Sequence, residues 1–269
     1  MKRQLRRIWF RAALLLWPFG DLVKKFARLP FIGKKVAQIL WNEKNLEATY
    51  IPVDENIEIP SSNALPMEFI EELARIACER FILSYCLCRA SRKCKNYPKE
   101  IGCVFLGEAA GEIDKRYGRR ASIEEVLEHA RAATSIGLIP CVIHGKFDAS
   151  LFGIDYRKML AICFCDDCCC TLRTDMRKGP LEYRDRIQRF EGLKLEAGEN
   201  CDACGKCAEA CFLDAISIGE KGPSFAEWCK GCGRCVSVCP HQNIKLVFNP
   251  PSHIKEEFLA KISKRTDIT

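Results

Sequence analysis

The chain has 269 residues, of which 19 are cysteine, and a formal net charge of +7. This length suggests one or two domains. The N-terminal residues lack the uninterrupted apolar stretch and small-residue cleavage site of a secretory signal, so we expect a cytoplasmic protein with reduced thiols. The odd cysteine count also argues against a disulfide scaffold, and we therefore expect most of the thiols to bind metal.

The first predicted unit is a basic amphipathic arm, residues 1–46. Residues 1–44 contain eleven Lys and Arg but only two acidic residues, so the rest of the chain carries a net charge of −2. Tryptophan, phenylalanine and leucine alternate with the cations, which is typical of helices that lie in a membrane interface. The longest uncharged run, 12–20, is well short of the ~20 residues that cross a bilayer.

We therefore expect this arm to contact an anionic membrane surface, on the inner face of the membrane. Docking on a partner subunit or packing against the protein's own body are the alternatives. Nucleic acid is a poorer match, because three tryptophans and many leucines suit lipid or protein better.

The second predicted unit is a cysteine-rich middle domain, residues 47–190. Residues 48–60 alternate as extended chain, and Pro66 begins a helix. A second helix is expected over 104–117, and Ser122-x-x-Glu125 is a capping box that opens a third, closed by Gly137. Two strands, 138–144 and 158–164, should follow.

Three helices and a strand pair give a winged-helix-like outline, which raises the possibility of DNA binding. The helix in the recognition position carries three glutamates against one arginine, so it would repel phosphate.

Nine cysteines of this domain fall in two knots, at 86–103 and 163–170. We predict that the knots hold at least one further iron–sulfur cluster, with Cys₄ zinc as the main competitor. One set would be Cys86, Cys88, Cys94 and Cys103; the other would be Cys163, Cys165 and Cys168 with Cys169 or Cys170. Consecutive cysteines in extended chain point to opposite faces, so 168–170 cannot all bind one ordinary cube. Cys78 and Cys141 are expected to be core residues.

Four cations, Arg89, Arg92, Lys93 and Lys95, surround the first knot. Cations near a cluster raise its reduction potential and can orient an anionic substrate. A solvated basic loop is the alternative interpretation.

Two cysteine runs follow in the third predicted unit, residues 191–249. They read Cys201-x2-Cys204-x2-Cys207-x3-Cys211 and Cys229-x2-Cys232-x2-Cys235-x3-Cys239-Pro240. This spacing places three thiolates on one iron–sulfur cube and the fourth on its neighbour. The predicted ligands are Cys201, Cys204, Cys207 and Cys239 for one cluster, and Cys229, Cys232, Cys235 and Cys211 for the other.

The segment after each run alternates as a short strand, so residues 195–248 form an internal pseudo-repeat. This pseudo-repeat resembles the bacterial two-cluster [4Fe-4S] ferredoxin domain. The resemblance implies a βαβ-type fold and two [4Fe-4S] cofactors. Phe212 stands where that family usually has proline, which affects the turn and not the ligands. Residues 250–269 are a C-terminal tail, and the expected fold class for the whole chain is α+β.

The expected function is electron transfer, with low-potential electrons relayed through two [4Fe-4S] clusters and at least one further cluster. No nucleotide-binding fingerprint and no recognisable catalytic histidine pairing occurs, so no catalytic residue is predicted. A redox partner protein or complex is the expected partner. The alternatives are an oxidoreductase that reduces a small substrate at a middle-domain cluster, and an iron–sulfur redox-sensing regulator.

Overall fold

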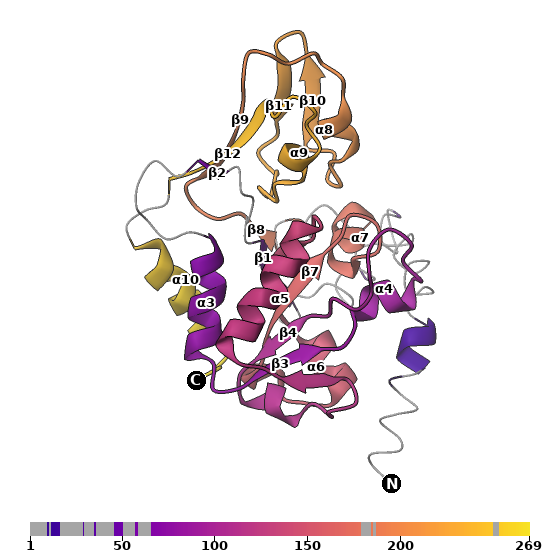
Figure 1. The fold of residues 1–269 in the computed structure, drawn as a ribbon, viewed down its shortest axis with the longest axis vertical. Coiled ribbons are helices and arrows are strands. Elements are labelled where there is room, and N and C mark those ends of the chain that lie inside the picture. The colour runs from indigo at the N-terminus through magenta and orange to yellow at the C-terminus, as the bar shows by residue number, and fades with distance from the viewer. Residues whose placement is uncertain are drawn as a thin grey trace.

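The computed structural model describes residues 10, 12–16, 29, 35, 46–50, 57–58, 66–178, 184, 187–249 and 253–269. Most of the predicted arm therefore lies outside the described residues. The fold is α+β, as predicted, with a helix-covered sheet forming the body and a smaller cysteine-bearing segment at one end of it (Figure 1).

The body is organised by a seven-stranded sheet with strand order β5-β3-β4-β7-β6-β1-β8. Neighbouring strands are antiparallel except for β1 and β8. Its strands are β1 (Leu46–Tyr50), β3 (Arg80–Leu83), β4 (Val104–Leu106), β5 (Gly118–Arg120), β6 (Ile139–Gly145), β7 (Leu160–Cys165) and β8 (Ile187–Gln188). The register pairs Cys141 of β6 with Cys163 of β7, so both thiols belong to one face of the sheet.

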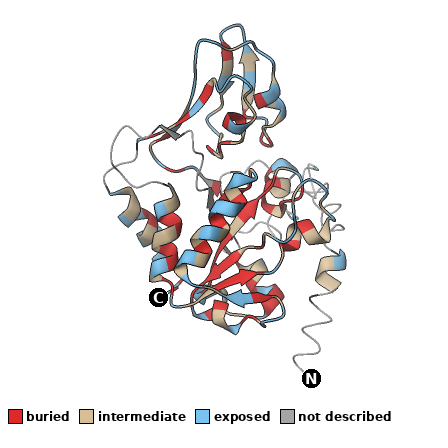
Figure 2. Cartoon of the chain, in the orientation of Figure 1, coloured by how far each residue is buried: buried red, intermediate tan, exposed pale blue. Residues whose placement is uncertain are grey.

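Two long helices, α3 (Pro66–Ile76) and α5 (Ile123–Ser135), cover the other face of the sheet. The predicted capping box is present, since Ser122 accepts the backbone N–H of Glu125 and the Glu125 carboxylate accepts the N–H of Ser122. Gly137 ends the helix in the left-handed region, with φ 82°. The apolar sides of both helices and of the central strands are buried (Figure 2).

The remaining helices of the described body are short, apart from the last. They are α4 (Leu87–Ser91), η1 (Glu108–Glu112), α6 (Lys146–Phe152), η2 (Tyr156–Lys158), α7 (Thr171–Lys178) and α10 (Ile254–Ser263). The helix α10 lies beside α3 (Figure 1), where the ring of Phe258 packs edge-on against Phe69 at 5.4 Å. The predicted tail is therefore part of the core.

The winged-helix-like outline is wrong for this body. The segment expected as the second helix, 104–117, instead forms β4 and the short 3₁₀ helix η1, and β5 follows directly after it. The apolar pattern of a short run such as Val104–Leu106 fits a helix and a buried strand equally well. Here the run forms a strand because it pairs with β3 and β7. The strands expected over 138–144 and 158–164 do pair, as β6 and β7, but inside a larger sheet.

The C-terminal cysteine segment folds as two similar halves. Its strands are β9 (Leu193–Ala197), β10 (Ile216–Gly219), β11 (Gly222–Phe225) and β12 (Ile244–Phe248), with α8 (Lys206–Glu209) and α9 (Arg234–Ser237) between them. β10 pairs with β11, while β12 pairs with β9 and with β2 (Ile57–Glu58).

The two halves repeat the same backbone conformations at one constant interval along the chain. Gly205 and Gly233 precede the two helices with φ of 76° and 80°. Asp214 and Gln242, after the two runs, both have left-handed backbones with φ of 52° and 50°. Because both pairs of angles recur at the same spacing, the pseudo-repeat expected from the sequence is a repeat of backbone conformation.

Candidate iron–sulfur and thiolate sites

The first predicted ferredoxin set comes together around one cavity. Its four cysteines line this cavity together with residues of α8 and the loop before β12: Cys201, Cys204, Cys207 and Cys239. The backbone N–H of Ala203 points at the sulfur of Cys201 at 3.4 Å, and that of Asn243 at the sulfur of Cys239 at 3.3 Å.

The second predicted set repeats this arrangement in the other half of the segment. Cys211, Cys229, Cys232 and Cys235 lie near enough for their charges to interact. The N–H of Gly231 points at the Cys229 sulfur at 3.4 Å, and that of Ala215 at the Cys211 sulfur at 3.3 Å.

These donors fit an iron–sulfur cube. Backbone N–H groups aimed at sulfur stabilise the thiolate form, which is the form that binds iron. Burial raises the pKa of Cys211, of Cys229 and, with the neighbouring thiols, of Cys235, so the thiolates need cationic metal to form together. The four thiolates of each set are negatively charged, and the iron ions of a cluster would supply the positive charge that balances them.

Four thiols of the body form a group in its interior that we call the buried tetrad, in which Cys86 is buried and Cys88, Cys103 and Cys163 are half-buried. Cys103 donates to the sulfur of Cys163 at 3.1 Å, and Cys88 donates to the hydroxyl of Thr171 at 3.2 Å. Hydrogen bonding with Cys103 raises the pKa of Cys86 to about 12. The tetrad combines three cysteines of the first sequence knot with one of the second, which differs from both predicted sets.

A neighbouring thiol group consists of Cys141, Cys165 and Cys170. A hydrogen bond with Cys141 is the largest effect that raises the pKa of Cys165. Cys141 is buried, as expected for a core residue, but its thiol also contacts another thiol. The i, i+2 spacing of Cys163 and Cys165 on a strand places both thiols on one face of the sheet. The sequence alone could not show that Cys141 lies beside them, because this depends on the pairing of β6 with β7.

The three remaining thiols of the knots, Cys94, Cys168 and Cys169, meet nearer the surface, and we call them the surface triad. Their sulfurs all lie within 4.8 Å of one another. Burial raises the pKa of Cys94, but hydrogen bonds from Cys169 and from the backbone of Tyr97 and Asn96 outweigh this and lower it. Cys78, outside all of these groups, follows the end of α3 and is exposed, so its predicted core position is wrong.

A buried ion pair holds the loop that carries the cysteines of the second knot. Arg89 is only 1% exposed and donates to Asp166 at 3.3 Å and to the carbonyl of Phe164 at 3.0 Å. Asp166 accepts the backbone N–H groups of Cys168, Cys169 and Cys170 through one carboxylate oxygen.

Arg89 is therefore a structural cation, and the expectation that it orients a substrate or lies in a solvated loop is wrong. Arg92 also serves the loop, because it donates to the carbonyl of Cys169 and to Thr171, both at 2.8 Å. Lys93 and Lys95 are exposed.

The second ferredoxin set lies against the body's thiols. One buried core contains Cys165 and Cys170 of the body with Phe212, and Cys163, Cys211, Cys229 and Cys232 pack on it. The guanidinium of Arg173 lies 4.5 Å from the centre of the Phe212 ring. On the rim, Arg234 of α9 pairs with Asp167 of the body at 2.7 Å.

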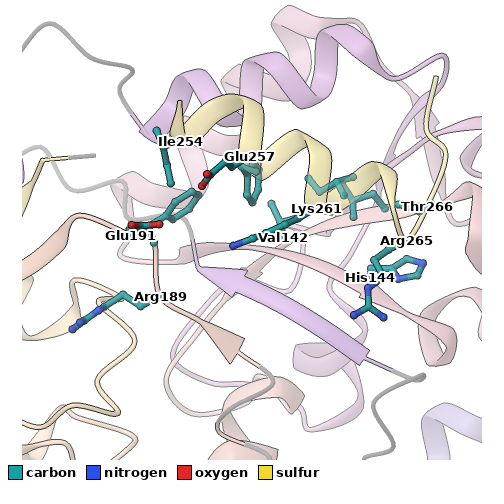
Figure 3. A pocket seen from close by; sticks show the side chains of 13 residues that line it. Val142, His144, Arg189, Glu191, Ile254, Glu257, Lys261, Arg265 and Thr266 are labelled. Atoms are coloured by element: carbon teal, nitrogen blue, oxygen red, sulfur yellow. The ribbon is translucent and has the colours of Figure 1, made fainter. Parts of the chain in front are cut away.

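A separate cavity of about 200 Å³ lies between α10 and the sheet (Figure 3). Charged side chains of both signs line it: Glu191 and Glu257 lie near one end, and Arg265 lies near the other, beside His144. None of the described residues that line it is a cysteine, so it belongs to none of the thiol groups.

Comparison with known proteins identifies one part of the chain. The family of the 4Fe-4S binding domain matches residues 225–245, which contain all four cysteines of the second run. No curated protein and no solved structure matches. The chain thus carries a ferredoxin-type 4Fe-4S segment and is an iron–sulfur electron-transfer protein. Among the described residues, no helix has the length and apolar composition that crossing a membrane requires.

Proposed function

We propose that this protein is an internal electron relay with three iron–sulfur centres. Two [4Fe-4S] clusters would be held by the two ferredoxin sets, and a third centre by the buried tetrad. An iron–sulfur cluster takes up and releases one electron at a time. Four thiols from three separate segments match the ligand number of a cube.

One observation carries the relay: the second ferredoxin set and the body's thiols share a buried core. Cys211 and Cys229 pack on the same buried core as Cys163, and Cys165 belongs to that core. Electron tunnelling falls steeply with distance, so centres must lie close together to exchange electrons. The first ferredoxin set lies away from this core and opens to its own cavity, which makes it the better site for exchange with a redox partner.

Iron content tests the third centre. Protein purified without oxygen should contain about 12 Fe per chain, against about 8 for the ferredoxin pair alone. The variant Cys103→Ser should lose about four iron atoms, because Cys103 belongs to the tetrad. Cys78→Ser is the matched control and should keep all of its iron, because Cys78 is exposed and outside every thiol group. Equal iron in the two variants would contradict a cluster on the tetrad.

The arm attaches the relay to an anionic membrane surface or to a redox complex in this proposal. Phe10 of the arm is buried, and its ring lies 4.4 Å from that of Tyr117, so the arm contacts the body at this residue. Leu15 and Leu16 are 76% and 60% exposed, which leaves apolar surface for lipid or for a partner.

Flotation with anionic liposomes tests the membrane form of this attachment. Leu15→Glu/Leu16→Glu should float less than the wild type, because both leucines are exposed and their replacement leaves Phe10 in place. Phe147→Glu is the control, an exposed aromatic residue on α6. If both variants float as well as the wild type, the result would favour a protein partner.

A further inference from the structure

The surface triad brings three possible metal ligands within 4.8 Å of one another, which no other group of histidine, cysteine, aspartate or glutamate side chains does among the described residues. The sulfurs of Cys94 and Cys168 are 3.6 Å apart, and Cys169 completes a group with all distances within 4.8 Å. A tetrahedral ion with metal–sulfur bonds of about 2.3 Å places its sulfurs about 3.8 Å apart.

We propose that Cys94, Cys168 and Cys169 bind a single Zn²⁺ ion through three thiolates and leave its fourth position to a water molecule. Thiolate ligands select soft or borderline cations, of which Zn²⁺ suits a tetrahedral sulfur site. This site is separate from the buried tetrad and does not depend on the proposed relay. Because zinc has no redox chemistry, it would lie outside the electron path.

The triad is built from two chain segments, distant in sequence, that are fastened together. Three successive N–H groups of the loop, those of Cys168, Cys169 and Cys170, converge on Asp166. The convergence turns the backbone, so the first two of these cysteines can face one point although neighbours in extended chain cannot. Arg92 joins the two segments through the carbonyl of Cys169.

The surroundings of the triad leave the fourth position open. Among the described histidine, cysteine, aspartate and glutamate side chains, no fourth ligand atom lies within 4.8 Å of all three sulfurs. Cys168 is exposed, so solvent reaches the group. Structural zinc sites have four protein ligands, whereas sites that bind and exchange a further ligand have three.

Metal analysis of the full-length holoprotein tests the site. After purification without oxygen and dialysis to remove loosely held ions, we expect about one Zn per chain by mass spectrometry. Cys168→Ala and Cys94→Ala, one from each segment, should each lower zinc by at least about ten-fold and leave iron unchanged, as expected for loss of one of three ligands. Cys78→Ala is the control and should keep its zinc.

Zinc X-ray absorption of the wild type should show three sulfur neighbours and one oxygen, and this measurement does not depend on any variant folding. Absence of zinc, zinc that persists in both triad variants, or four sulfur neighbours would each overturn the proposal. Loss of about four irons in Cys168→Ala would overturn it too, because the triad would then hold a cube. A failure of the iron count in Cys103→Ser would concern the relay alone.

Discussion

The ferredoxin-type segment and the cysteine-rich body gather their thiols in different ways. In the segment, each set takes three cysteines from one short run and one from the other, and the backbone angles of one half recur in the second. In the body, Cys103 meets Cys163 and Cys94 meets Cys168, which are pairs of residues far apart in the sequence. Local backbone conformation therefore organises the first region, whereas sheet pairing and a buried ion pair organise the second.

The largest effect should come from removing the buried cation of the body. Arg89→Met leaves Asp166 buried without its ionic partner, which should cost about 3–5 kcal/mol in the free energy of unfolding. Denaturation followed by circular dichroism measures this. Arg119→Met is the control, since its partner Glu125 is at the surface and the loss should be much smaller. Equal losses would contradict the role given to the ion pair.

A smaller effect should follow from crowding the strand that delivers Cys103. A Cβ on Gly102 would lie 2.2 Å from the carbonyl oxygen of Leu83. Gly102→Ala should therefore lower the unfolding free energy by about 1–3 kcal/mol and reduce the iron that the proposed third centre binds. In Gly219→Ala, in the ferredoxin-type segment, the new methyl would come no closer than 3.8 Å to a neighbouring atom, so stability and iron should change little. A larger loss in Gly219→Ala would reverse the comparison.

The repeat of the ferredoxin-type segment can be tested at two equivalent positions. Asp214 and Gln242 adopt left-handed backbones that glycine adopts without steric cost. Asp214→Gly and Gln242→Gly should each stabilise the segment by up to about 1 kcal/mol. Thermal unfolding without oxygen should move in the same direction in both variants, and opposite shifts would show that the halves are not equivalent.

The smallest effect concerns the pH dependence of the body. Burial lowers the pKa of His129 below its usual value, Arg119 and Arg89 lower it further, and the hydrogen bond that Nε2 donates to the Gly102 carbonyl at 2.8 Å opposes them. The unfolded chain therefore binds a proton more tightly than the folded one. Stability from this group is complete above pH 6.5 and declines as the pH falls below it.

His129→Gln should remove part of this decline. Denaturation midpoints of the two proteins, measured between about pH 8 and pH 5, should converge as the pH falls. Parallel pH profiles would show that His129 titrates normally in the folded protein.

The ferredoxin-type segment could be predicted from the sequence, because its cysteine runs are patterns of short-range spacing. The runs with their glycines, the two strands that follow them and the capping box of α5 are all local patterns, and the structure has each of them. The 4Fe-4S family match at 225–245 agrees with the second run.

The grouping of the body's thiols could not be predicted in this way, because it depends on how distant segments pack. The sequence divided them into knots by proximity along the chain, but the tertiary structure distributes them into three groups, of which the buried tetrad and the surface triad cross this division. Whether Val104–Leu106 is a helix or a strand likewise depended on the neighbouring strands. The physical reason is that pairing and burial are long-range: a single chain segment specifies its own turns, but not which distant segment will lie beside it.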